Sequence, residues 1–295
     1  MHFRPNRAFL FCAMVGACFW TAGSASVTET SEPPPFDPGI SEGGRAESAD
    51  AWAQAQRRAF QNAFSVVRRL EDTNDPELLR HVRFSEALLL LNVQPLTQEN
   101  VRRAKAIFQD LAAGPEEDAL KRMAWYHYAR TLEWHQSPID FDGAYHAYLE
   151  LYESAPDDYV AQLAMMRAGV MDVLGRYYAS KEELRARLRH WTGVAEHLTF
   201  PGPRRNLFNV VGDTIAIHGF SPEWALDVYT RASDTGYTRW DFRMLGVIRQ
   251  FMWSRRVGQT ERAIQAMEQF LETYSFTPYA FYVRQMLKEA RNAME

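Results

Sequence analysis

Ser41 is the residue whose surroundings come nearest to a catalytic motif. It is the centre of GISEG, Gly39 to Gly43, which fits the G-x-S-x-G pattern of a nucleophilic serine. That pattern works only on a sharp turn between a strand and a helix. Here the segment lies in a proline-rich stretch without a strand pattern before it, so we expect no catalytic role for Ser41.

The histidines lack the spacing of a metal site. If His127 and His135 share a helix, its rise separates them by about 12 Å, too far to bind one metal ion together. The sequence also lacks H-E-x-x-H and the Glu-x-x-His pair of di-iron bundles. We therefore expect packing or surface histidines, with His190 partly buried, and no metal or other cofactor.

The charged residues indicate helix ends and solvent-exposed surfaces rather than a catalytic site. We expect the acidic pairs at 116–117, 157–158 and 182–183 to lie at helix starts, where negative charge favours the helix dipole. The net charge of -4 argues against nucleic acid as a partner. We interpret five arginines as a solvated face, with a docking surface for an acidic partner as the alternative. They are Arg185, Arg187, Arg189, Arg204 and Arg205.

Helices are the elements that the sequence predicts from residue 51 onward. Apolar residues recur with helical spacing, and strict alternation is almost absent. Proline, glycine and acidic residues mark helix ends, so the spacing predicts about eleven helices and an all-α chain. The breaks fall at 72–76, 93–97, 113–118, 136–142, 154–158, 199–203, 219–222, 234–238 and 275–278.

One packing pattern recurs along these helices. Ala144 is followed one turn later by Tyr148, then by Leu151, and Pro156 ends the segment. The small residue lets a neighbouring backbone approach, and the ring fills the space beside it. Copies recur about every 40 residues, which is typical of stacked helix pairs, with a helical bundle of chance periodicity as the alternative. The other copies begin at Ala63, Ala104, Ala186, Ala225 and Ala263, and His190 and Gly193 complete the one at Ala186.

The helices before two of these copies carry a second pattern. It comprises Trp125, Tyr128, Ala129 and Leu132, and then Phe208, Val211, Gly212 and Ile215. Here the chain resembles the tetratricopeptide repeat (TPR) family. The pattern of that family is Trp-x-x-Leu-Gly-x-x-Tyr, followed by Ala-x-x-x-Phe and then by Pro. The resemblance implies a right-handed α-solenoid of stacked antiparallel helix pairs over residues 51–295. The usual TPR period is shorter, at 34 residues, so HEAT-like repeats remain the alternative. Residues 159–178 allow two registers, with the small position at Ala168 or Gly169.

The resemblance also implies where a partner would bind. In this family the concave side, lined by the first helix of each pair, holds an extended peptide. That implies a non-enzymatic scaffold or adaptor, and the last helix pair looks like envelope repeat proteins that assist outer-membrane assembly. An enzyme or small-ligand binder with a pocket between helices is the alternative. The residues of this chain at the family's partner-binding positions are Tyr126, Arg130, Glu133, Asn206, Asn209 and Asp213.

The N-terminus has the pattern of a signal peptide over residues 1–25. Arg4 and Arg7 precede an apolar run that is too short to span a membrane, and small residues follow up to Ala25. Within it, VGAC resembles a bacterial lipobox, in which Cys18 would carry the lipid.

Residues 26–50 are rich in Ser, Glu, Pro and Gly, which predicts a flexible linker. We therefore expect an exported protein, periplasmic, or associated with the outer membrane if Cys18 is lipidated. Its partner would be a protein or peptide of the envelope, and an N-terminal lipid would be its contact with the membrane.

Overall fold

The computed structural model describes residues 60–70, 73–236, 240–292 and 294. Within these ranges the regular structure is helical and contains no strand, which confirms the all-α prediction. The predicted signal peptide and linker, with Cys18 and Ser41, lie outside the described residues.

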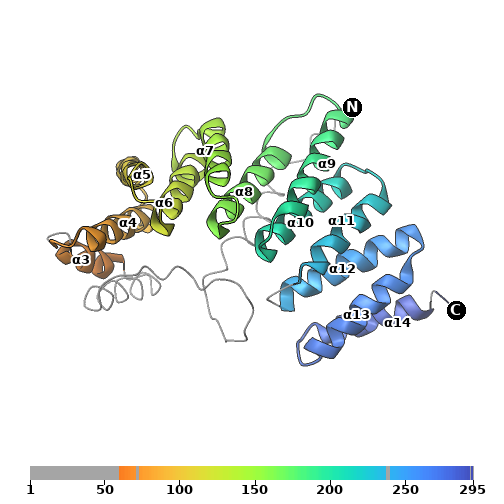
Figure 1. The fold of residues 1–295 in the computed structure, drawn as a ribbon. Coiled ribbons are helices and arrows are strands. Elements are labelled where there is room, and N and C mark those ends of the chain that lie inside the picture. Colours follow the sequence, from red (N-terminus) through yellow and green to blue (C-terminus); the bar gives the residue numbers. More distant parts are fainter. Residues whose placement is uncertain (1–59, 71–72, 237–239, 293, 295) are drawn as a thin grey trace. The chain divides into compact units, whose positions relative to one another are not determined.

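The helices pack in chain order (Figure 1). Each one contacts the next, and α8 also packs against α6 and α10. The first half comprises α3 (Phe60–Leu70), α4 (Pro76–Asn92), α5 (Gln98–Ala112), α6 (Ala119–Arg130), the π-helix η1 (Thr131–His135), α7 (Phe141–Ser154) and α8 (Tyr159–Gly175). The second comprises α9 (Lys181–His197), α10 (Pro201–Ile217), α11 (Pro222–Asp234), α12 (Trp240–Val257), α13 (Thr260–Tyr274) and α14 (Ala280–Asn292).

Polar side chains fix the starts of many helices by accepting hydrogen bonds from free backbone N–H groups. Asp158 caps α8, and Glu182 and Glu183 lie in the first turn of α9, so these acidic pairs do stand at helix starts. The capping residues are Asp75, Thr97, Asp118, Asp140, Asp158, Ser180 and Ser221.

Two breaks in the helical pattern were missed from the sequence. One separates α8 from α9, where Ser180 accepts a hydrogen bond from the Glu183 N–H. Ser-x-x-Glu is a known helix-start signal, so this break could have been found. The other follows α12 at Gly258, whose positive φ of 71° suits a glycine at a helix end.

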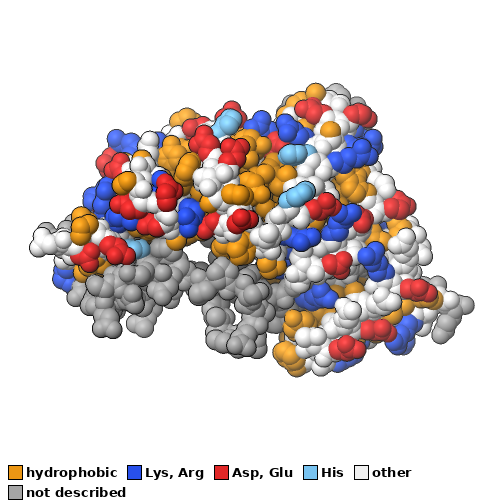
Figure 2. Space-filling model, in the orientation of Figure 1, with side chains coloured by type: hydrophobic (Ala, Val, Ile, Leu, Met, Phe, Trp, Pro, Cys, Tyr) orange, Lys and Arg blue, Asp and Glu red, His pale blue; other side chains and the backbone are white. Residues whose placement is uncertain are grey.

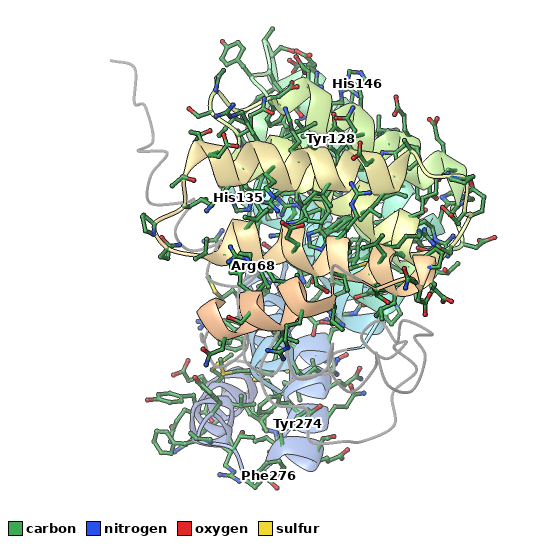
Figure 3. All side chains as sticks on the ribbon, turned by 90° about the vertical axis from the view of Figure 1, so that its left-hand side faces the viewer. Arg68, Tyr128, His135, His146, Tyr274 and Phe276 are labelled. Carbon is green, nitrogen blue, oxygen red and sulfur yellow. The ribbon has the colours of Figure 1, made fainter. Side chains whose placement is uncertain are left out.

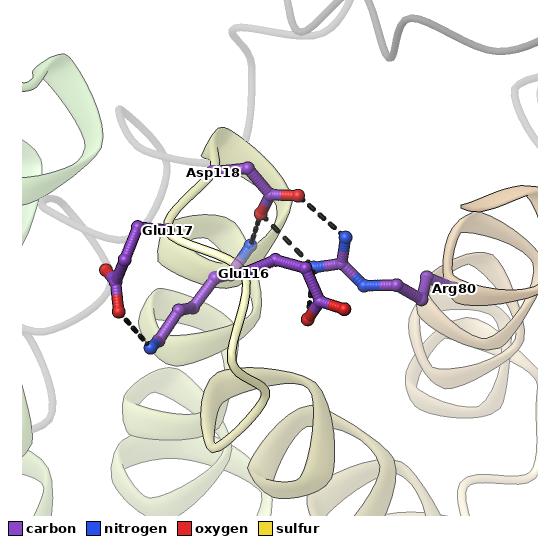
Figure 4. A network of polar contacts seen from close by, with 5 residues as sticks. Arg80, Glu116, Glu117 and Asp118 are labelled. Carbon is purple, nitrogen blue, oxygen red and sulfur yellow. Dashed lines mark hydrogen bonds and ion pairs between the residues drawn. The ribbon is translucent and has the colours of Figure 1, made fainter. Parts of the chain in front are cut away.

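One capping residue also joins α4 to α6 (Figure 4). The Asp118 carboxylate accepts a hydrogen bond from the Lys121 N–H at 2.8 Å. It also accepts hydrogen bonds from Arg80 Nη1 and Nη2 at 2.7 and 3.2 Å. Burial alone raises the pKa of Asp118, but the hydrogen bonds from Arg80 and Lys121 outweigh it and leave that pKa below its usual value. The start of α6 is therefore tied to α4, as well as to its own first turn.

The recurring small-and-large positions form much of the core. Ala144, Tyr148 and Leu151 are all 0% exposed, as their pattern predicts. The corresponding positions of three other copies are buried too. They are Ala104, Phe108 and Leu111, then Ala225, Tyr229 and Ala232, and then Ala263, Met267 and Phe270.

The copy assigned at Ala186 was wrong. Ala186 and His190 are exposed, so the expectation of a partly buried His190 also fails. The side chains that α9 buries begin two residues earlier in the chain. They are Leu184, Leu188, Trp191 and Ala195.

The close approach on this pair of helices is provided by α8 instead. A Cβ on Gly169 would lie 2.6 Å from Leu207 Cδ1 and 2.9 Å from Trp191 Cε3, so these side chains would have to shift to admit it. Ala168 is buried as well, but Gly169 is the position at which the absence of a side chain lets Leu207 and Trp191 come this close.

Enlarging Ala144 to leucine is expected to lower the free energy of unfolding by about 1–3 kcal/mol, because the site is fully buried and overpacking strains its neighbours. Thermal and urea unfolding of Ala144→Leu measure this. The exposed Ala186→Leu on α9 is the matched control and should stay within about 0.5 kcal/mol. Equal effects at the two positions would contradict a tight helix crossing at Ala144.

Candidate functional site

A carboxylate, a tyrosine and an arginine meet where η1, α7 and α8 join. Glu133 Oε2 accepts a hydrogen bond from the Tyr148 hydroxyl at 2.9 Å, and Glu133 Oε1 pairs with Arg167. The side chains of Glu133 and Arg167 are only 9% and 11% exposed. The Arg167 guanidinium also lies over the Trp134 ring, 5.6 Å from its centroid. We call Glu133, Tyr148 and Arg167 the first clamp.

The same three chemical groups meet again between α10, α11 and α12. The Tyr229 hydroxyl donates to Asp213 Oδ1 at 2.7 Å, and Arg249 Nη2 donates to Asp213 Oδ2 at 2.7 Å. A Cβ on Gly212 would lie 2.7 Å from the Tyr229 ring, so this contact requires the glycine. We call Asp213, Tyr229 and Arg249 the second clamp. Each clamp fixes a tyrosine helix to the helix before it and the helix after it.

The surroundings of the first clamp favour a neutral Tyr148 and a charged Arg167. Burial, and then the charge of Glu133, raise the pKa of Tyr148 well above its usual value. Burial alone lowers the pKa of Arg167, but the Glu133 carboxylate outweighs it and the net pKa is raised. A neutral tyrosine and a permanent guanidinium suit a structural tie, whereas acid–base catalysis needs a pKa near the working pH.

Two of the predicted partner-binding residues have their polar atoms occupied by the clamps. Both carboxylate oxygens of Glu133 and both of Asp213 accept hydrogen bonds from within the chain. Asn209 Oδ1 accepts one from Arg249 Nη1 at 3.2 Å, which leaves its amide N–H groups. Tyr126 is half-buried, with its ring centroid 5.7 Å from that of Tyr148.

Arg130 and Asn206 are different, because neither makes a hydrogen bond or an ion pair with the described residues. Asn206 is exposed, and Arg130 is half-buried at the end of α6. Burial, and then the charge of Arg130, lower the pKa of His127 to about 3 and also lower that of His135, which is labelled in Figure 3. Arg130, which has no ion pair among the described residues, is the group here that can attract an acidic ligand.

The structure gathers the six predicted residues into two groups. Tyr126, Arg130 and Glu133 belong to α6 and η1, whereas Asn206, Asn209 and Asp213 belong to α10. Helix α8 packs against both α6 and α10 and stands between the two groups along the chain. A ligand that reached both groups would therefore have to extend past α8.

The sequence analysis missed Arg167 and Arg249, which complete the clamps. Both lie on the helix that follows the clamp tyrosine, and this shared placement is a signal that comparison of the two copies could have revealed. It also missed Asp172, which is 0% exposed and accepts the Trp191 indole N–H at 2.7 Å.

We call Arg185, Arg187, Arg189, Arg204 and Arg205 the basic patch. Several of these arginines contact other groups of the chain. Arg205 is buried and donates to the Gly236 carbonyl at 2.7 Å, while Arg187 lies 3.7 Å from the Asp172 carboxylate. Arg185 lies over the Phe220 ring at 5.2 Å. On the face shown in Figure 2, acidic and basic side chains are intermixed. These contacts leave less free positive charge than the five arginines suggest.

Within the described ranges, no group of three or more His, Cys, Asp or Glu residues is placed to hold a metal ion. No helix in the same ranges has the length and apolar character needed to cross a bilayer. No protein-family model matches the chain, and no curated protein matches it.

Proposed function

We propose that the chain is a non-enzymatic scaffold of TPR-like helix pairs that binds a protein or peptide in the bacterial cell envelope. The observation that carries this proposal is the contrast between two kinds of polar group. Those of the clamps tie successive helices together, while Arg130 and Asn206 on the first helices make no hydrogen bond or ion pair with the part of the chain that the structure describes. Groups held on packed helices lose little freedom when a partner binds, which favours affinity.

The chemistry around Arg130 indicates the kind of partner. An unpaired guanidinium can bind a carboxylate through two parallel hydrogen bonds, and Tyr126 offers a half-buried ring one turn away. Asn206 and the free N–H groups of Asn209 suit the carbonyl groups of an extended chain. The proposed partner is therefore an extended segment with an acidic side chain or a C-terminal carboxylate.

The N-terminal sequence supports the envelope as the place of action. Arg4 and Arg7 before an apolar run are typical of an export signal. Cys18 would supply a lipid anchor, and the polar stretch at 26–50 would give the helical part reach from it.

Arg130→Glu is expected to weaken capture of the partner about 10-fold or more, because it replaces an attraction with a repulsion. The free energy of unfolding should change by no more than about 0.5 kcal/mol, since Arg130 has no hydrogen bond or ion pair to lose among the described residues. A crosslinking pull-down from the envelope fraction, read by mass spectrometry, measures capture, and a melting curve of the same protein measures stability.

Arg189→Glu is the matched control, because Arg189 is exposed on α9 and lies in the basic patch. It should capture the same partner as the unmodified chain. If Arg189→Glu loses the partner while Arg130→Glu retains it, the binding surface lies on α9 and the assignment to α6 is wrong.

A further inference from the structure

A polar groove runs between α11 and α13, which both pack against α12. Two adjoining cavities of about 360 and 290 Å³ form it, and Arg243 and Gln269 line both. The larger cavity reaches Ser233 at the end of α11, and the smaller one reaches Tyr274, which is labelled in Figure 3.

Arg243 connects the two sides of this groove. Its Nη1 donates to the Ser233 carbonyl on α11 at 3.3 Å, and its Nη2 donates to Gln269 Oε1 on α13 at 3.2 Å. At the α11 end, Arg205 from α10 holds the Gly236 carbonyl at 2.7 Å. The walls of the groove are therefore tied to each other and to α10.

Gln250 is the unexplained residue in this groove. It lines the larger cavity and is only 5% exposed, yet its side chain makes no hydrogen bond with the described residues. Its neighbour Arg249 faces α10 through the second clamp, and successive helical residues point about 100° apart. Its amide atoms are open to the cavity and are not sealed in the core, so they are free to bind a ligand there.

The chemistry of the groove fits a peptide backbone. Gln250 and Gln265 each offer one acceptor and two donor hydrogens, which match the N–H and C=O groups of an extended chain. The smaller cavity has an aromatic residue, Tyr274, but the larger one has none among its lining residues, so it lacks the stacking platform that a sugar ring would use.

Charge and length define the ligand further. Arg262 and Glu272, both without an ion pair among the described residues, line the groove toward opposite ends of α13. The helical rise between them is roughly 15 Å. An extended chain rises about 3.3 Å per residue, so roughly five residues would fill that length.

We propose that this groove is a second binding site, which holds about five residues of an extended peptide through Gln250. An acidic residue of the peptide would lie at the Arg262 end and a basic one at the Glu272 end. The site is separate from the surface around Arg130, and either one can fail without the other.

The test uses the full chain and a bead-bound pool of random pentapeptides, followed by fluorescence polarisation with the enriched sequences. Gln250→Leu should weaken binding of these peptides about 10-fold or more, since it removes the hydrogen bonds of a buried amide. The melting temperature of Gln250→Leu should equal or exceed that of the unmodified chain, because Gln250 makes no hydrogen bond with the described residues that the substitution could remove. Gln285→Leu, at an exposed position on α14, is the control and should leave binding unchanged.

Three results would overturn the proposal. One is a pool without enriched peptides, and another is enriched peptides that bind Gln250→Leu and the unmodified chain equally. The third is a fall in the melting temperature of Gln250→Leu, because it would show that the amide has a structural role. If peptides with a terminal acidic residue are enriched and bind Arg262→Glu more weakly than the unmodified chain, the proposed direction of the peptide in the groove is supported. Since Arg130→Glu should bind these pentapeptides normally, failure here leaves the scaffold proposal standing.

Discussion

Glu133→Ala is expected to lower the free energy of unfolding by about 3–5 kcal/mol, because it leaves a buried arginine without its counter-ion. Arg167 is 11% exposed, so water cannot replace the lost carboxylate, and the Tyr148 hydroxyl loses its acceptor as well. Urea unfolding followed by circular dichroism measures the change, with the slope checked to show that the transition stays two-state.

The second clamp provides a matched comparison. The side chains of Asp213 and Arg249 are 22% and 29% exposed, roughly twice as much as those of the first clamp. Asp213→Ala should therefore lower the free energy of unfolding by less than Glu133→Ala does, by about 1–2 kcal/mol, because water can reach the released arginine.

Removal of both charges of the first clamp separates the ion pair from the packing around it. Glu133→Ala combined with Arg167→Met should recover part of the loss, because no unpaired charge remains. Equal losses for Glu133→Ala and Asp213→Ala, with no recovery in the double variant, would show that the clamps contribute mainly through packing.

The parts of the fold that the sequence predicted are the ones encoded over a single helix. Ala144, Tyr148 and Leu151 share one face whenever their segment is helical, so their burial follows from spacing alone. The clamps could not be predicted in that way. The Glu133–Arg167 pair is separated by more than thirty residues in the chain, and only the packing of α8 against α7 and η1 brings it together.

The error in α9 shows how a local pattern can be overridden. Ala186 and His190 have suitable spacing, but Leu184, Leu188 and Trp191 offer more apolar area to the core. Trp191 also finds a buried acceptor in Asp172 at 2.7 Å. A scan of small-and-large spacing sees neither the larger apolar stripe nor the acceptor on α8.

The candidate site illustrates the same limit. Position along the first helices singled out Arg130 and Asn206, which make no hydrogen bond or ion pair with the described residues. It could not distinguish them from Glu133 and Asp213, whose carboxylates are occupied by residues of other helices. Whether a polar residue is available to a partner depends on long-range neighbours, which helical spacing does not reveal.

Gln162, which the sequence analysis did not single out, joins two turns of the chain. It is 1% exposed, and Nε2 donates to the Pro156 carbonyl at 2.9 Å and to Thr199 Oγ1 at 2.8 Å. Oε1 accepts the N–H groups of Thr199 and Phe200, both at 2.9 Å. One side chain therefore links the start of α8 to the turn that precedes α10, with every polar atom satisfied.

Gln162→Met is expected to lower the free energy of unfolding by about 3–5 kcal/mol, which places it beside Glu133→Ala as the most damaging change. Methionine keeps nearly the same volume, so the loss comes from the four hydrogen bonds that Gln162 makes to the two turns, at about 0.5–1.5 kcal/mol each. Gln109→Met, at an exposed position on α5, is the control and should change stability by less than about 0.5 kcal/mol. Hydrogen exchange of the Thr199 and Phe200 amides is the local readout, and both should lose protection in Gln162→Met. If those two amides stay protected and unfolding shifts by less than about 1 kcal/mol, the backbone has found other acceptors and Gln162 does not hold the two turns together.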